Sequence, residues 1–259
     1  MIHQITTATD PRVALYGELR DRHLRRPAGL FVAESELVVR RLLQSALEVH
    51  SVFTSESRAE ALAALRPDID IFAATPEMMK HIVGFPFHRG VLALGTRPAT
   101  PELPANCARL LVIEDITDVD NLGSLIRSGA AFGIHGVLLS PRCADPYYRK
   151  ALRTAVGCTF ALPIVRATRW PEALGELRER YGCRLIAAVL AAEAIGLTDY
   201  RAPDRFALCV GSEGPGLTPE ARAACDDAVT IPMTGGADSL NVGVAAAIIL
   251  HRLVSTHAR

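Results

Sequence analysis

The stretch IPMTGGADSLNVGVAAAIILH, residues 231–251, joins a glycine-containing loop to a helical segment that is apolar on every face. Ser239 and Asn241 stand where this helix begins, and either side chain can accept hydrogen bonds from the first unpaired backbone N–H groups. The same N–H groups, behind a glycine-rich loop, can instead bind a ligand. A helix without a polar face indicates burial, either inside a layered domain or at a subunit interface.

Upstream of this helix, apolar strands alternate with helices. Residues 109–115 (RLLVIED), 135–140 (HGVLLS) and 205–211 (RFALCVG) are predicted strands, and residues 121–133 and 170–182 are predicted helices. Fully apolar strands separated by helices indicate a parallel sheet that is covered on both faces. Ligands of such sheets bind at the carboxyl ends of the strands, so we expect the site in the loops that follow them.

The first hundred residues predict a smaller sheet. The predicted strands are 29–34, 48–54, 69–74 and 90–95, and the predicted helices are 11–24, 35–46, 57–65 and 76–83. Ser35 is expected to cap the helix that it begins. Three prolines within RPATPELPAN, residues 97–106, predict a linker. We therefore expect an α/β fold, with a small N-terminal α/β/α sandwich over 1–96, a linker over 97–107 and a C-terminal parallel-sheet domain over 108–259.

Composition narrows the class of protein. The 259 residues carry a formal net charge of zero, so any nucleic-acid partner must be held by local positive charge, for which RDRHLRR (residues 20–26) is the best candidate. The six cysteines are dispersed, which favours reduced thiols in a cytoplasmic protein. We predict no metal site, because the histidines and cysteines lack ligand spacing. No segment is suited to cross a membrane, and the N-terminus lacks the pattern of a targeting signal.

Two further loops carry polar residues at predicted strand ends. Asn121, Gly123 and Arg127 form an N-x-G-x-x-x-R pattern on a helix, and SEGPGLT (residues 212–218) follows a buried strand. Arg127 lies in an otherwise apolar segment, so it either forms an ion pair with a nearby aspartate (Asp115, Asp118 or Asp120) or contacts an anion or hydroxyl at the strand ends. A G-x-G-x-x-G fingerprint and a Walker lysine are both missing, which disfavours a standard dinucleotide site and phosphoryl transfer.

Taken together, and in this order, three segments resemble the signatures of SpoU/TrmH-type RNA methyltransferases of the SPOUT class. These segments are DNLGSLIRSGAAFG, LCVGSEGPGL and IPMTGGADSLNVGVAAAIIL. The resemblance extends from about residue 108 to the end, while the first hundred residues resemble, less specifically, the substrate-binding domain of many members. Two departures stand out: Ser35 replaces a glycine, and Asp118-Val119-Asp120 replaces an Asp-Pro sequence.

The resemblance implies a fold, a reaction and roles for particular residues. Members transfer a methyl group from S-adenosylmethionine to a ribose 2′-hydroxyl of rRNA or tRNA, without a metal, and they are homodimers joined through a domain with a trefoil knot. Carried over, the backbone around Gly211, Ile231 and Leu240 is expected to hold the adenosine part of the donor. Arg127 contacts the target nucleotide, either as the base or only to position the hydroxyl, since a guanidinium stays protonated at neutral pH. Arg127, the nucleotide and the loops are expected to be oriented by Asn121, Glu213, Ser239 and Asn241.

An rRNA 2′-O-methyltransferase is the function we expect, because the separate N-terminal domain favours a large structured RNA. A tRNA enzyme is the alternative within the class. A non-catalytic RNA-binding or ribosome-assembly factor and an enzyme acting on small nucleotides are the alternatives outside it. The sequence leaves open which nucleotide is methylated, and whether the role is in ribosome function or in antibiotic resistance.

Overall fold

The computed structural model of the protein describes residues 1–17, 29–84, 90–99, 101–236 and 238–255. The chain forms two compact units: Met1–Ala99 with Pro146–Ala161 (unit 1), and Thr100–Asp145 with Leu162–Arg259 (unit 2). Residues 146–161 belong to unit 1, whereas the expected division placed them in the C-terminal domain over 108–259. The reason is hydrophobic, because Leu152 and Phe160 belong to the core of unit 1.

Unit 1 contains a five-stranded mixed sheet in the order β1-β4-β3-β5-β2. Its strands are β1 (Ile2–Gln4), β2 (Leu30–Glu34), β3 (Val49–Ser55), β4 (Ile71–Ala74) and β5 (Val91–Thr96). β1, β4 and β3 are parallel to one another, and β5 is antiparallel to both β3 and β2. The four predicted strands are confirmed. The three-residue β1 was missed, since it is too short to show an alternating pattern.

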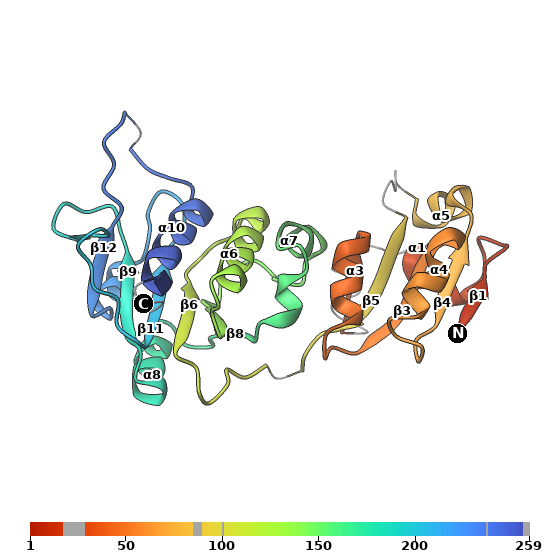
Figure 1. The fold of residues 1–259 in the computed structure, drawn as a ribbon, viewed down its shortest axis with the longest axis horizontal. Coiled ribbons are helices and arrows are strands. Elements are labelled where there is room, and N and C mark those ends of the chain that lie inside the picture. The colour runs from red at the N-terminus through yellow and green to blue at the C-terminus, as the bar shows by residue number, and fades with distance from the viewer. Residues whose placement is uncertain (18–28, 85–89, 100, 237, 256–259) are drawn as a thin grey trace. The chain divides into compact units, whose positions relative to one another are not determined.

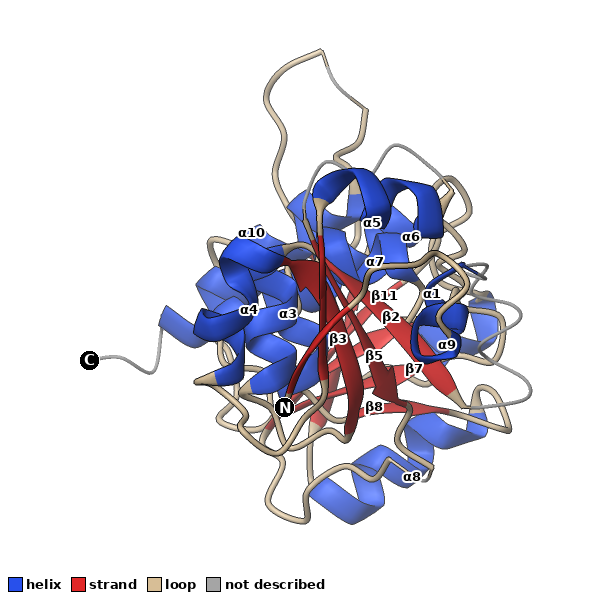
Figure 2. Ribbon diagram, turned by 90° about the vertical axis from the view of Figure 1, so that its right-hand side faces the viewer, coloured by secondary structure: helices blue, strands red, loops and turns tan. Residues whose placement is uncertain are grey.

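Helices cover both faces of this sheet. The elements of unit 1 are η1 (Pro11–Val13), α1 (Ala14–Gly17), α3 (Glu36–Leu43), α4 (Glu56–Ala63), α5 (Pro76–Val83), α7 (Arg149–Thr154) and η2 (Cys158–Ala161). Along β2, Phe31 and Ala33 join a core with α3, α4 and α7, whereas Leu30 and Val32 join a core with α1 and α5. Figure 2 shows α3 and α4 on one side of β3 and β5, and α1 on the other. The predicted α/β/α sandwich is confirmed.

Two expectations for unit 1 had other outcomes. Ser35 precedes α3, but its side chain makes no capping hydrogen bond, so that prediction was wrong. Its φ of 90° and ψ of 149° are accessible to glycine and strained for other residues. The predicted helix over 11–24 is described only as far as Gly17. The basic segment 20–26 lies outside the described residues.

Unit 2 contains a seven-stranded parallel sheet in the order β10-β12-β9-β11-β6-β7-β8. Its strands are β6 (Arg109–Ile113), β7 (Gly136–Leu139), β8 (Ile164–Arg166), β9 (Arg184–Ala188), β10 (Ile195–Gly196), β11 (Phe206–Val210) and β12 (Asp227–Thr230). The chain runs outward from β6 through β7 to β8, and then crosses to β9 on the other side. β11 returns to lie between β6 and β9, so the loops after β6 and β11 are neighbours at the carboxyl edge.

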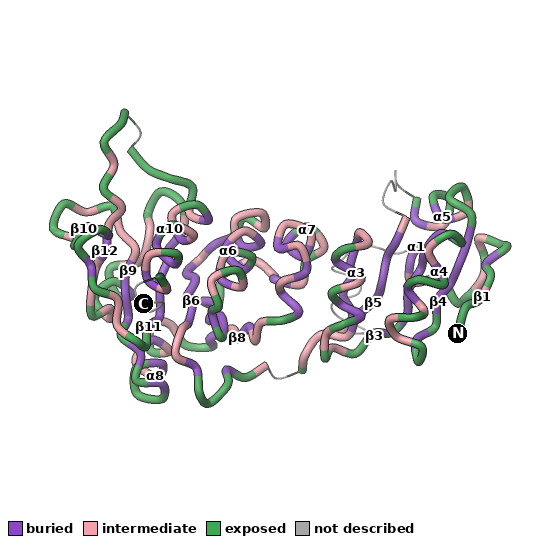
Figure 3. Tube along the Cα trace, in the orientation of Figure 1, coloured by how far each residue is buried: buried purple, intermediate pink, exposed green. Residues whose placement is uncertain are grey.

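The helices of unit 2 lie on both faces of the sheet, whose strands are largely buried (Figure 3). They are α6 (Val119–Ala131), α8 (Glu172–Tyr181), α9 (Pro219–Ala223) and α10 (Val242–Ser255). α8 and α9 share a core with Leu110, Val112 and Ala207. α6 and α10 lie against each other (Figure 1), and α10 also contacts β11. The predicted parallel-sheet α/β fold is confirmed, and the trefoil knot stays a prediction. In the described part of the chain, every helix is too short or too polar to cross a membrane.

Candidate functional site

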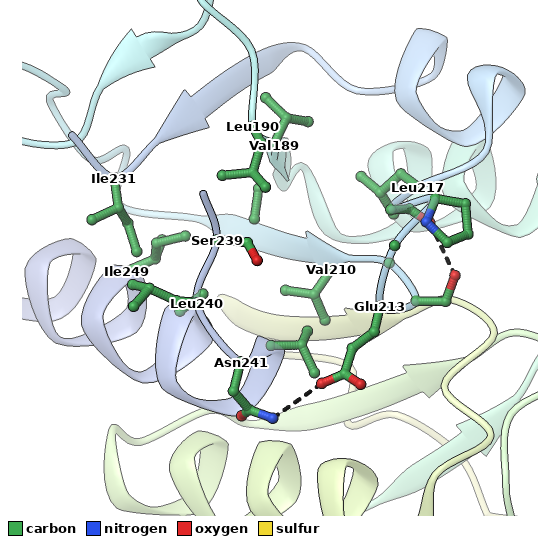
Figure 4. Close-up of a pocket in the computed structure, with 18 of the residues that line it drawn as sticks. Val189, Leu190, Val210, Glu213, Leu217, Ile231, Ser239, Leu240, Asn241 and Ile249 are labelled. Atoms are coloured by element: carbon green, nitrogen blue, oxygen red, sulfur yellow. Dashed lines mark hydrogen bonds between the residues drawn. The ribbon is translucent and has the colours of Figure 1, made fainter. Parts of the chain in front are cut away.

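A cavity of about 520 Å³ lies in unit 2 at the carboxyl ends of β9, β11 and β12. Most of its lining comes from three chain segments: 188–190 at the end of β9, 210–217 at the end of β11, and parts of 231–242. Arg222, Val229, Ala245 and Ile249 complete it. In Figure 4, Ile231 and Leu217 lie on opposite sides of this cavity. The sequence predicts a ligand site at the carboxyl ends of parallel strands, and this cavity lies there.

Asn241 connects the three motif segments. Its Nδ2 donates to Asn121 Oδ1 at 2.8 Å and to Glu213 Oε1 at 3.1 Å, the second of which is drawn in Figure 4. Its Oδ1 accepts from the backbone N–H groups of Gly243 at 2.9 Å and Val244 at 3.3 Å. Because the oxygen is used in capping α10, the amide nitrogen must face the other two motifs. Asn241 therefore caps the helix and also orients the site.

The start of α6 is fixed in a similar way. Asp118 Oδ1 accepts from the backbone N–H groups of Asp120 and Asn121, both at 2.9 Å, and so caps the helix. This places Asn121 in the first turn, pointing its side chain at Asn241. The Asp-Val-Asp sequence thus keeps an aspartate that caps, although it lacks the proline.

Arg127 lies two turns along α6 and is exposed. It belongs to none of the ion pairs that join described residues, so the pairing considered with Asp115, Asp118 or Asp120 is not formed. Asp115 instead binds Arg142 and Ser140. Burial acts to raise the pKa of Asp115, but these hydrogen bonds outweigh it and lower the pKa below its usual value. Arg127 is left with its guanidinium in solvent, on the same helix as Asn121.

The other predicted site residues line the cavity: Gly211, Ile231, Ser239 and Leu240. At Gly211 any side chain is excluded, because a Cβ atom would lie 2.1 Å from the carbonyl carbon of Gly216 and 2.2 Å from the nitrogen of Leu217. Gly216 also donates its N–H to the Ser212 carbonyl at 3.0 Å, closing the loop on itself. A glycine is needed here for close approach of two backbone segments.

Sequence reasoning missed the contribution of β9. Val189 and Leu190 line the cavity, and Leu190 is 64% exposed. The available signal was the apolar end of the run CRLIAAVL, which continues past the strand at the same sheet edge. Among the described residues, no group of three or more His, Cys, Asp or Glu side chains is placed to hold a metal ion.

A parallel α/β sheet with a ligand-sized cavity at its carboxyl edge, bounded by a glycine turn and a capped helix, is the arrangement of proteins that bind a small molecule at strand ends. A model of the SpoU rRNA Methylase family matches residues 108–251. The chain belongs to this family of RNA methyltransferases, as the three signature segments indicated.

Several known proteins are similar over nearly the whole chain. An uncharacterized tRNA/rRNA methyltransferase of Mycobacterium bovis is 36% identical over 265 residues, which cover 96% of this chain and 91% of that protein. The SpoU methyltransferase AviRb from Streptomyces viridochromogenes, solved in complex with AdoMet (S-adenosylmethionine), is 26% identical with a TM-score of 0.82, covering 96% of this chain and 99% of AviRb. A solved RNA 2′-O ribose methyltransferase is also 26% identical with a TM-score of 0.82, covering 99% and 100%.

Proposed function

We propose that this protein transfers a methyl group from AdoMet to a ribose 2′-hydroxyl, with rRNA as the substrate. The observation that carries the proposal is the junction at Asn241, which joins Asn121 and Glu213 beside the cavity. The similarity to AviRb, which was solved with AdoMet, and to the solved RNA 2′-O ribose methyltransferase supports the choice of donor and of acceptor atom.

The residues around the cavity fit AdoMet. The cavity volume of about 520 Å³ is within the range of ligand pockets. Apolar walls from Ile231 and Leu240 suit the flat adenine ring, and the glycine at 211 lets backbone polar groups approach the ligand. When bound, the donor supplies an electrophilic methyl group on a sulfonium.

The polar side chains then position the acceptor. Asn241 holds Glu213 and Asn121 in one orientation, and Ser239 borders the same cavity. Arg127, exposed and unpaired among described residues, is free to contact the target nucleotide and to position its hydroxyl. Positioning of this kind supplies roughly 7–11 kcal/mol in well-oriented reactions. In the transfer, the hydroxyl oxygen would bond to the methyl carbon while the carbon–sulfur bond of the donor breaks, releasing the thioether S-adenosylhomocysteine, and the hydroxyl proton would pass to solvent water. We assign Arg127 the positioning role.

Local positive charge in unit 1 supports its role as the RNA-binding domain. Glu36 is flanked by Arg40 at 2.9 Å and Arg58 at 3.2 Å, and Glu34 by Arg149 at 3.7 Å and Arg153 at 3.9 Å. Each of these carboxylates lies beside two arginines, which makes this part of unit 1 a candidate basic surface in a chain whose net charge is zero. Such a surface attracts RNA phosphates. Because α7 contributes two of the four arginines, residues 146–161 act with unit 1 on this proposal.

The exposed face of α10 supports a homodimer. Val244 and Ile248, four residues apart on one face of the helix, are 49% and 40% exposed, and the preceding Leu240 is 38% exposed. Contiguous exposed aliphatic side chains mark an interaction surface. We propose likewise that the protein is a homodimer, that unit 2 contains a trefoil knot and that the protein is cytoplasmic.

The test is transfer of labelled methyl from AdoMet to unmodified bulk rRNA and, in a parallel reaction, to tRNA. Label in an alkali-resistant dinucleotide from rRNA is the expected result, because a 2′-O-methyl group blocks alkaline cleavage. Label in tRNA alone establishes the tRNA alternative. Tight RNA binding without transfer to either RNA contradicts the proposal and favours the assembly-factor alternative.

A further inference from the structure

Glu114, directly after β6, is 1% exposed and carries a carboxylate into the interior of unit 2. No arginine, lysine or histidine among the described residues forms an ion pair with it. Three uncharged donors bind it instead: the Thr218 backbone N–H at 2.8 Å, the Thr218 hydroxyl at 2.8 Å, and the indole N–H of Trp170. A buried carboxylate without a cation is costly, so its position invites a functional explanation.

The carboxylate and the backbone of Glu114 hold the two ends of one loop. The Glu114 N–H donates to the carbonyl of Val210 at 2.9 Å, just before the loop, and the carboxylate holds Thr218, just after it. Between these points lie residues 211–217, each of which lines the cavity. Thr218 is further fixed because its hydroxyl oxygen accepts from the Ala221 N–H at 3.2 Å and so caps α9.

The loop has little room to absorb a shift of either end. Gly211 is against the backbone of Gly216 and Leu217, and Ser212 is bridged to Gly216. A displacement of Thr218 therefore moves the backbone that forms the cavity wall. Interiors packed this closely transmit strain rather than absorb it.

From this geometry we infer that Glu114 is a positioning residue of the donor site: it sets the shape of the 211–217 loop, and Trp170 reports the state of that loop. The inference rests on the proposed function, since it takes AdoMet as the ligand of the cavity. Trp170 is the only tryptophan of the chain, so its emission is specific to this hydrogen-bond network.

The experiment is titration of AdoMet into the full-length protein without RNA, by calorimetry and by tryptophan emission. Glu114→Gln keeps the shape of the side chain but replaces one acceptor oxygen with a donor facing the Thr218 or Trp170 donors. We expect AdoMet to bind about tenfold more weakly, in line with loss of a hydrogen bond to a charged group. The emission change on binding should shrink with it. The matched control is Glu220→Gln, the same substitution on the exposed first turn of α9, which should bind AdoMet as the wild type does.

Two further variants separate positioning from a general loss of structure. Thr218→Ser keeps both donors to Glu114 and should retain wild-type affinity, whereas Thr218→Val keeps only the backbone donor and should weaken binding about threefold. In turnover, Glu114→Gln should raise the KM for AdoMet while kcat at saturating AdoMet stays near that of the wild type.

Equal AdoMet affinity of the wild type and Glu114→Gln overturns the inference while the proposed function stands. A fall in kcat alone, with KM unchanged, overturns it as well. If the wild type itself fails to bind AdoMet, the proposed function is wrong and the inference falls with it.

Discussion

Single residues in this protein are chosen by backbone geometry as much as by side-chain chemistry. Glycine is required at 211 because the backbone of Gly216 and Leu217 lies too close for a side chain. Asn241 caps α10 with its Oδ1 and binds Asn121 with its Nδ2. Ser35 is the opposite case, since it occupies a conformation that glycine adopts without strain.

Substitution of Gly211 should damage the loop directly. A methyl group in Gly211→Ala meets backbone atoms that cannot move aside, and overpacking of this kind costs about 1–3 kcal/mol. We expect a lower urea midpoint and at least tenfold weaker AdoMet binding by calorimetry. Gly175→Ala is the control, since nothing lies within 4 Å of its new Cβ within helix α8, and it should stabilise the protein by about 0.5–1 kcal/mol. Unchanged AdoMet affinity in Gly211→Ala would contradict this account of the loop.

Ser35→Gly should stabilise the protein. Residues held at such backbone angles carry on the order of 1–3 kcal/mol of strain, and the added chain entropy of a glycine offsets about 0.5–1 kcal/mol of the gain. Urea unfolding should therefore show a net increase of about 1 kcal/mol. Ser57→Gly, inside α4, should have the opposite sign because glycine disfavours helix. A destabilised Ser35→Gly protein would contradict the backbone strain assigned to Ser35.

At the scale of elements, helix starts organise the site. Asp118 caps α6, Thr218 caps α9 and Asn241 caps α10, and each cap positions a residue that lines the cavity or supports its wall. α10 uses one face for this unit and presents another, with Val244 and Ile248, to the surroundings. The segment 231–251 therefore contributes a capped helix to the site and a candidate subunit interface.

Ile248→Asp should therefore convert the protein to a monomer. A charge in the centre of an apolar interface loses its hydration without gaining a partner. Sedimentation equilibrium should show the dimer mass for the wild type and the monomer mass for the variant. Leu37→Asp, at a leucine of α3 that is 51% exposed, is the matched control and should leave the mass unchanged. A wild-type monomer at micromolar concentration would refute the proposed dimer.

For the whole molecule, the sequence predicted the fold class well, because apolar strand runs and the periodicity of the helices between them can be recognised from the sequence alone. It placed Gly211, Ile231, Ser239 and Leu240 at one cavity only through the rule for parallel sheets and the family resemblance. It could not predict the hydrogen bonds of Asn241 to Asn121 and Glu213, since these residues are 120 and 28 positions away. Glu114 was missed for the same reason, as its partners Thr218 and Trp170 are 104 and 56 positions away.

RNA affinity belongs to the whole molecule, because its charge sums to zero and only a local surface can bind phosphates. The double variant Arg149→Ala/Arg153→Ala should bind rRNA more weakly and reduce the slope of log K against log salt concentration by about 1–2. Filter binding at several salt concentrations measures this slope. Arg169→Ala, an exposed arginine of unit 2 paired with Glu176, is the control and should keep the wild-type slope. An unchanged slope in the double variant would place the RNA elsewhere.

The central claim is that the three motif segments form one site for methyl transfer to a ribose hydroxyl. It is tested most directly by single-turnover transfer of labelled methyl from AdoMet to rRNA, comparing the wild type with Arg127→Ala. We predict label in an alkali-resistant dinucleotide for the wild type, and a rate reduced about 100-fold or more in Arg127→Ala with AdoMet affinity unchanged, because Arg127 lies outside the cavity lining. Label on a base, or an Arg127→Ala rate equal to that of the wild type, would contradict the account.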